Sequence, residues 1–123
     1  MGEDKPADQL AVLKLFVENG QNVNAIGFNG RSILMKFVGF EHKEAVRYLL
    51  DKTAINLGLK LTGAVLMKGY TARAGESAID IAKNMLKKMT GASEEDVGRI
   101  NNMEKIVEML GKVTSNTLNN FQF

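Results

Sequence analysis

The chain has 123 residues, 45% of them hydrophobic and 24% charged, and its charges nearly cancel to a formal net charge of +2. This length favours one domain, and the apolar content excludes a chain that is disordered because of its composition. The absence of cysteine excludes disulfides and thiolate metal sites, which suits a reducing cytosol.

Residues 1–7 are predicted to be an N-terminal extension. The start is acidic and lacks the basic segment, followed by an apolar stretch, that marks a secretory signal. No apolar run elsewhere approaches the roughly 18 residues of a membrane helix. We therefore expect a cytoplasmic protein without membrane contact.

Residues 8–19 carry apolar side chains at helical spacing, which predicts a first helix. Asp8 is placed to accept the first free backbone N–H groups of that helix. Gly20 is a C-terminal stop signal. No other helical pattern precedes this one.

The loop over 20–31 is predicted to hold a tight turn. Asn29-Gly30 is a strong turn dipeptide, because both residues tolerate positive φ. Ser32, directly after the loop, stands where a hydroxyl group caps a helix.

Two helices are predicted after this loop. A short apolar pattern covers 32–40, Glu41 and His42 make a turn, and a stronger pattern covers 43–52. The residues of the second helix that should face inward are Ala45, Val46, Leu49 and Leu50.

The order loop, helix, turn, helix fills about 33 residues and resembles an ankyrin repeat. The resemblance implies a β-turn finger, in which the Asn24 amide ties down the finger backbone, and a His42 side chain that bonds to loop backbone. The sequence departs from the family motif at Ile33 and Met35, where proline and histidine are usual. The positions that the resemblance assigns to structural turns and caps are Asn24, Gly30, Ser32, His42, Asn56, Gly75 and Ser77.

Residues 57–74 contain the extra length by which the next repeat is longer than the usual period, and they are predicted to form a β-hairpin. Leucines alternate with other residues over 57–61, Thr62-Gly63 can turn the chain, and 64–70 can return as a second strand. On the resemblance, this hairpin is an enlarged finger that projects from the array.

A final helix pair is predicted over 75–113. Ser77 stands at a capping position, and the helix that follows it extends to Gly91. The acidic run 93–96 is typical of a helix start, and one apolar face predicts a second helix over roughly 94–112. For the methionines of this pair we favour core filling over an adaptable binding surface. They are Met85, Met89, Met103 and Met109.

The expected fold class is an all-α repeat, an ankyrin-type helix-turn-helix stack, with a short inserted β-hairpin. A single ankyrin-repeat domain over 8–113 would comprise a half-repeat cap (8–24), a full repeat (25–56), an inserted hairpin finger (57–74) and an elaborated final repeat (75–113). Residues 114–123 are expected to be a mobile tail.

No catalytic or metal constellation is found in the sequence. His42 is the only histidine, and no nucleophile or second ligand keeps a fixed spacing to it, so a structural role is favoured over that of a general base. No phosphate-binding glycine motif is present. We therefore expect no enzyme, no cofactor and no metal.

Several exposed positions are candidates for binding a partner. Ile26 and Phe28 flank the first finger tip, where exposed apolar residues invite a partner, although packing of Phe28 against the enlarged finger is an equal alternative. Others are expected beside the groove or on the large finger, where tyrosine and arginine are typical of interface hot spots. The predicted partner-binding residues are Ile26, Phe28, Lys36, Phe40, Lys60, Lys68, Tyr70 and Arg73.

The family resemblance implies non-catalytic binding of another protein. Two versions stay open: an intracellular inhibitor, such as an immunity protein that neutralises a toxin, and an adaptor or effector that binds a host protein. A different class, nucleic-acid binding, would use the weak basic patch of Lys60, Lys68 and Arg73. Nucleic acid is not the expected partner, because elsewhere basic and acidic residues alternate.

Overall fold

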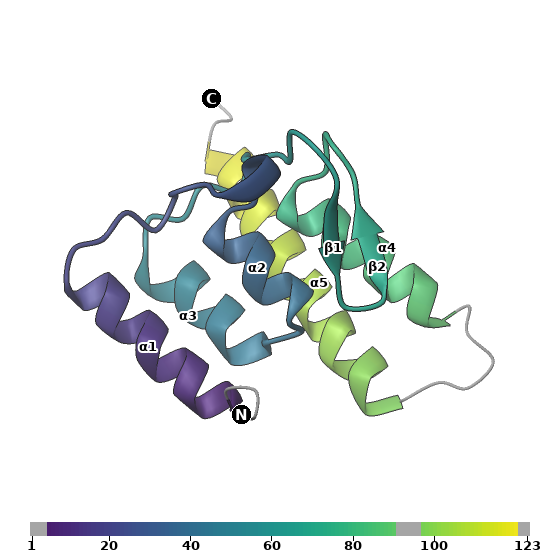
Figure 1. Cartoon of the computed structure of the whole chain (residues 1–123), viewed down its shortest axis with the longest axis horizontal. Coiled ribbons are helices and arrows are strands. Elements are labelled where there is room, and N and C mark those ends of the chain that lie inside the picture. The colour runs from purple at the N-terminus through teal and green to yellow at the C-terminus, as the bar shows by residue number, and fades with distance from the viewer. Residues whose placement is uncertain (1–4, 91–96, 121–123) are drawn as a thin grey trace.

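The computed structural model describes residues 5–90 and 97–120 of the chain. These residues are mostly helical, with five α-helices and one two-stranded antiparallel sheet (Figure 1). The helices are α1 (Pro6–Glu18), α2 (Ile33–Gly39), α3 (Lys43–Lys52), α4 (Ala78–Thr90) and α5 (Val97–Asn120). The strands are β1 (Val65–Met67) and β2 (Tyr70–Ala72), and a 3-10 turn covers Phe28–Gly30.

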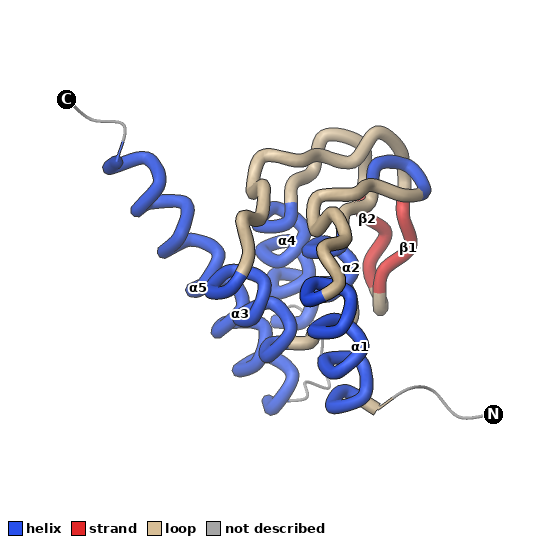
Figure 2. Tube along the Cα trace, turned by 90° about the vertical axis from the view of Figure 1, so that its left-hand side faces the viewer, coloured by secondary structure: helices blue, strands red, loops and turns tan. Residues whose placement is uncertain are grey.

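The helices pack as two neighbouring pairs. α2 packs on α3 and α4 packs on α5, while α2 contacts α4 and α3 contacts α5, so the two pairs lie side by side. α1 packs on α3 at the other side of that helix from α5. Figure 2 shows that the longer loops gather at one end of the helices, with the hairpin on the α2 side.

One apolar core runs through both helix pairs. Burying an aliphatic side chain of this kind contributes about 1.5–3 kcal/mol. The largest fully buried side chains come from α2, α3, α4 and α5 and are Leu34, Met35, Val38, Val46, Leu49, Ile81, Met85, Met103, Ile106 and Leu110. Met89 and Met109 are partly buried against this core. The methionines of the last helix pair therefore fill the core, as predicted.

Serine side chains cap the N-termini of α2 and α4, which we call the inner helices. The Ser32 hydroxyl accepts a hydrogen bond from the Met35 backbone N–H at 3.2 Å, and the Met35 sulfur accepts one from the Ser32 N–H at 3.4 Å. Ser77 Oγ likewise accepts from the Asp80 N–H at 3.4 Å. Both predicted caps are present, and Met35, where the family motif has histidine, takes part in the first cap.

Helix α1 begins two residues earlier than predicted. Pro6 starts the helix and Lys5 is the N-cap, so Asp8 lies within the first turn and does not cap it. Proline suits a first helical position, because its fixed φ is helical and its missing N–H would have no partner there. The predicted extension over 1–7 therefore overlaps the helix.

The predicted hairpin exists, but its register was wrong. The strands pair as Val65 with Ala72 and Met67 with Tyr70, so the turn lies at Lys68-Gly69 and not at Thr62-Gly63. Gly69 has φ of +70°, which a glycine adopts readily.

The leucines expected to form the first strand pack on the core instead. Leu61 is 3% exposed, and Leu57 and Leu59 are partly buried against the same core cluster. These leucines alternate because they lie on the side of an irregular segment that faces the helices. A period-2 pattern does not distinguish such a segment from a strand.

Helix α3 has the predicted bounds, whereas α5 is longer than predicted. Its backbone is helical as far as Asn120, so most of the expected mobile tail continues the helix. No proline or glycine follows Gly111 in this helix, so nothing in the sequence interrupts it. The predicted helix start at 93–96 and the end of the tail, 121–123, lie outside the described residues.

Within the described ranges, neither α5 nor a shorter helix is both long and apolar enough to cross a membrane.

Candidate binding groove

A groove of about 900 Å³ lies between α1, α2 and the hairpin. Its walls come from segments far apart in the sequence. In Figure 2 the hairpin lies on the α2 side of the molecule, away from α3 and α5. β1 is the strand that faces the groove, and β2 faces away from it toward α4.

The groove has a buried apolar floor and an exposed apolar rim. Leu13, Phe37 and Met67 form the floor and are each at most 7% exposed. The rim residues, by contrast, are 64% exposed at Val12, 47% at Phe40 and 78% at Leu66. Val12 lies on α1, Phe40 directly follows α2 and Leu66 lies on β1, so the packing of these three elements gathers them.

A glycine in α2 allows the hairpin to lie close to the helix. A methyl group on Gly39 would stand 2.5 Å from the Met67 sulfur, closer than two such atoms can approach. Val65 of β1 and its partner Ala72 of β2 are also buried, so the hairpin packs on the core. β1 therefore packs closely on α2 and forms one wall of the groove.

The groove is positively charged. Arg31, Lys36 and Lys68 line it, and no aspartate or glutamate within 5–90 or 97–120 does. The Lys36 ammonium lies 5.8 Å from the centre of the Phe40 ring, within range of a cation–π contact. Of the predicted partner-binding residues, the structure thus brings Lys36, Phe40 and Lys68 together here.

Tyr70 and Arg73 line a second, more open hollow between β2 and α4, of about 690 Å³. The Tyr70 hydroxyl donates to Glu76 Oε1 at 2.7 Å, and Asn84 Nδ2 donates to the same oxygen at 2.7 Å. Burial, and then the hydrogen bond and charge of Glu76, raise the pKa of the Tyr70 phenol. Glu76 thereby ties the base of the hairpin to α4.

The three residues of the predicted basic patch have different surroundings. Lys68 lines the groove, Arg73 lines the second hollow, and Lys60 lines neither. Lys60 instead forms an isolated antiparallel bridge with Ser77.

The first finger tip is exposed and lies outside both hollows. Ile26 is 58% exposed and Phe28 is 73% exposed, so Phe28 does not fold against the enlarged finger. The two loops meet instead through Asn29, whose carbonyl accepts from the Thr62 N–H at 2.8 Å and whose Nδ2 donates to the Ala64 carbonyl at 2.8 Å.

The Asn24 side chain bonds to a neighbouring loop. The prediction that it ties down the backbone of its own finger was therefore wrong. Its Nδ2 donates to the Ala54 carbonyl at 3.0 Å, and its Oδ1 accepts from the Asn56 N–H at 2.7 Å. Asn56 Oδ1 in turn accepts from the Gly58 N–H at 2.8 Å. These bonds align the two loops that precede the inner helices.

His42 is a buried structural residue. Its Nδ1 accepts a hydrogen bond from the Ala45 N–H at 3.2 Å and thereby caps α3. The Nε2 nitrogen lies 2.7 Å from the Pro6 carbonyl oxygen and must carry the proton in that bond. With both nitrogens engaged by backbone, His42 has none left for general-base chemistry. Across the described residues no three His, Asp or Glu side chains group as metal ligands.

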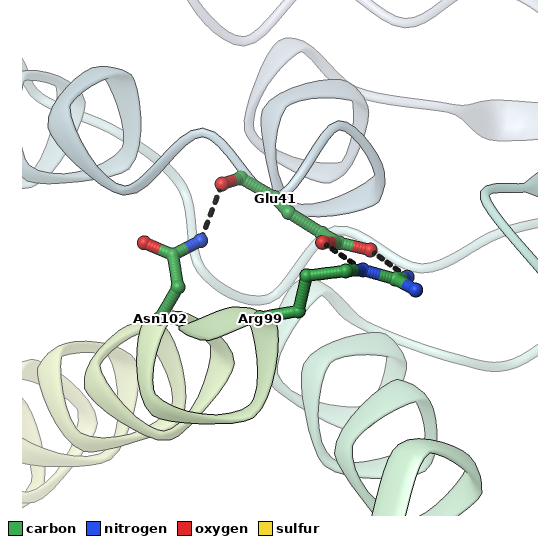
Figure 3. Close-up of polar contacts among 3 residues, drawn as sticks. All are labelled: Glu41, Arg99 and Asn102. Carbon is green, nitrogen blue, oxygen red and sulfur yellow. Dashed lines mark hydrogen bonds and ion pairs between the residues drawn. The ribbon is translucent and has the colours of Figure 1, made fainter. Parts of the chain in front are cut away.

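A partly buried ion pair that sequence reasoning missed fastens α5 to the α2–α3 turn (Figure 3). Arg99 donates from Nε to Glu41 Oε1 at 2.9 Å and from Nη2 to Oε2 at 2.6 Å, and Asn102 Nδ2 donates to the Glu41 carbonyl at 2.6 Å. The Glu41 side chain is only 6% exposed and its φ is +58°. The pair holds a left-handed turn residue in place and serves the fold.

Sequence reasoning also missed Val12, Arg31 and Leu66 as groove residues. Leu66 lies between buried Val65 and Met67, so a correct strand register would have placed it on the outer face. Val12 carried no such signal, because its role depends on α1 lying opposite the hairpin.

Comparisons of this chain with protein-family models and with curated protein sequences found no match.

Proposed function

We propose that this chain is a non-catalytic protein-binding module of ankyrin type, whose partner docks in the groove between α1, α2 and β1. The repeat architecture is supported by a local parallel between the two inner helices. Gly30 and Gly75 both have positive φ, at +81° and +92°, and each is followed two residues later by the capping serine. Ser32 and Ser77 each form an isolated antiparallel bridge with the preceding loop.

The observation that carries the binding function is the exposed apolar rim. Val12, Phe40 and Leu66 lie on or next to three different elements and meet around one groove. Scattered exposed apolar residues are ordinary, whereas a gathered set at a concave surface is typical of an interaction site.

We propose an intracellular inhibitor, such as an immunity protein that neutralises a toxin, with an adaptor or effector that binds a host protein as the alternative. Coexpression separates the two, because an inhibitor should restore growth to cells that express its toxic partner and an adaptor should not.

Site-directed photocrosslinking in native lysate tests the docking surface. Benzoylphenylalanine at Phe40 or Leu66 should trap the same discrete protein, and an excess of unlabelled wild-type chain should abolish the adduct. The control position is Arg47, which is exposed on α3 and lines neither hollow. Equal trapping at Arg47, or trapping at Phe28 alone, would contradict the proposed surface.

A further inference from the structure

We infer that the groove binds an acidic segment of a protein partner, in which carboxylates flank apolar anchor residues. The inference rests on the protein-binding function proposed above and specifies the chemistry of the partner. It follows from the charge of the groove, the position of its exposed apolar residues and the way in which one cation is held.

Among the residues that the structure describes, the cations of the groove have no acidic counterpart within it. Arg31 precedes α2, Lys36 lies on α2, and Lys68 lies at the hairpin turn, so the positive charges surround the groove from two walls. None of the described carboxylates forms a salt bridge with them. Because the whole chain is nearly neutral at +2, this imbalance is local. Such rim charges mainly speed association and select partners of the opposite sign.

The apolar rim requires more of the partner than negative charge. Val12, Phe40 and Leu66 stay largely exposed in the free chain, and covering them favours apolar anchors on the partner. Polynucleotides are acidic but would stack bases on aromatic rings, and Phe40 is the one exposed aromatic residue among the described lining residues. A peptide segment matches both features.

The Lys36 ammonium lies beside the apolar rim, so the charge and the apolar surface of the groove meet at this residue. Its ammonium lies 5.8 Å from the centre of the Phe40 ring, so one cation stands next to one apolar anchor. A carboxylate that pairs with Lys36 is therefore placed beside a side chain that packs on Phe40. A peptide segment in which an acidic residue stands close to an apolar residue can make both contacts at once.

Selection from a random peptide library displayed on phage tests the inference. The wild-type chain is the bait, and a Phe40→Ser/Leu66→Ser variant removes peptides that bind elsewhere. Both side chains are exposed, so the variant should fold, which circular dichroism checks. Selected peptides should be enriched in aspartate and glutamate next to apolar residues.

Charge reversal then checks the role of the cations. With a selected peptide as the probe, Lys36→Glu and Lys68→Glu should each weaken binding about tenfold, because an attraction becomes a repulsion. The matched control Lys83→Glu is on α4, outside both hollows, and should leave the affinity unchanged. Binding should also weaken as salt rises through the range where exposed charges are screened.

The outcomes separate the two levels of the proposal. Groove-dependent peptides that are neutral or basic would overturn the acidic partner and leave the protein-binding function standing. A library without groove-dependent binders would contradict both. Groove-dependent binding of a single-stranded oligonucleotide that is tighter than that of the selected peptides would replace the peptide partner with nucleic acid.

Discussion

The loops that precede α2 and α4 begin their helices with the same device but present different surfaces. Both end in a glycine of positive φ followed by a capping serine. The first is a short finger that leaves Ile26 and Phe28 exposed, whereas the second carries a hairpin that packs on α2. The shared device sets where the helices start, and the inserted hairpin supplies the wall that makes a groove.

The largest expected effect separates the two turn glycines. A methyl group on Gly30 would stand 2.9 Å from the Thr62 nitrogen, whereas Gly75 has nothing within 4 Å. Gly75→Ala should cost about 1 kcal/mol for its left-handed φ, and Gly30→Ala should cost roughly 3 kcal/mol, because backbone atoms must also move. Urea denaturation measures both. Equal losses would mean that the two loops are not held together at Gly30.

A second pair of glycines tests the attachment of the hairpin. Gly111→Ala on α5 meets only the Ile79 Cδ1 at 3.9 Å and should raise stability by about 0.5–1 kcal/mol through helix propensity. Gly39→Ala should give no such gain, because the Met67 side chain must move away. Thermal unfolding compares the two variants. A similar gain from both would show that Met67 yields freely and does not fix β1.

The two serine caps should differ modestly. Both caps are reciprocal, because Met35 accepts from the Ser32 N–H and the Asp80 carboxylate accepts from the Ser77 N–H at 3.0 Å. The hydroxyl bond that a Ser-to-Ala change removes is longer at Ser77, at 3.4 Å, than at Ser32, at 3.2 Å. Ser32→Ala should cost about 1 kcal/mol and Ser77→Ala somewhat less. Denaturation midpoints of the two variants give the difference. A larger loss at Ser77 would reverse this ranking of the two helix starts.

The smallest expected effect concerns the base of the hairpin at high pH. Because the folded-state pKa of Tyr70 is raised above 10.0, the unfolded chain loses this proton first, and stability should fall as pH rises above about 10. Tyr70→Phe should reduce that fall, as urea midpoints at pH 8 and above would measure. Tyr48→Phe is the matched control, and the same reduction in that variant would rule out Tyr70 as the source.

The sequence predicted the elements whose signals are local. The amphipathic pattern of α3 gave its bounds, and the serine caps located α2 and α4. The hairpin register failed because Leu57 and Leu59 alternate for reasons of tertiary packing, which local pattern does not contain.

The candidate site was predicted only in part for the same reason. Lys36, Phe40 and Lys68 were named as binding residues, and they do meet in the groove. Val12 and Leu66 were not named, because they are far apart in the sequence and only the packed fold brings them to one rim. Conversely, Lys60 and Arg73 were named as binding residues but do not line the groove.

The most direct test compares the groove with the first finger on the partner trapped through Phe40. Phe40→Ser/Leu66→Ser changes the groove, and Ile26→Ser/Phe28→Ser makes the same kind of change at the exposed finger tip. Calorimetry should show that the groove variant binds about a hundredfold more weakly, as expected for two hot-spot residues, while the finger variant keeps wild-type affinity. Loss of binding in the finger variant with full affinity in the groove variant would contradict the proposed docking surface.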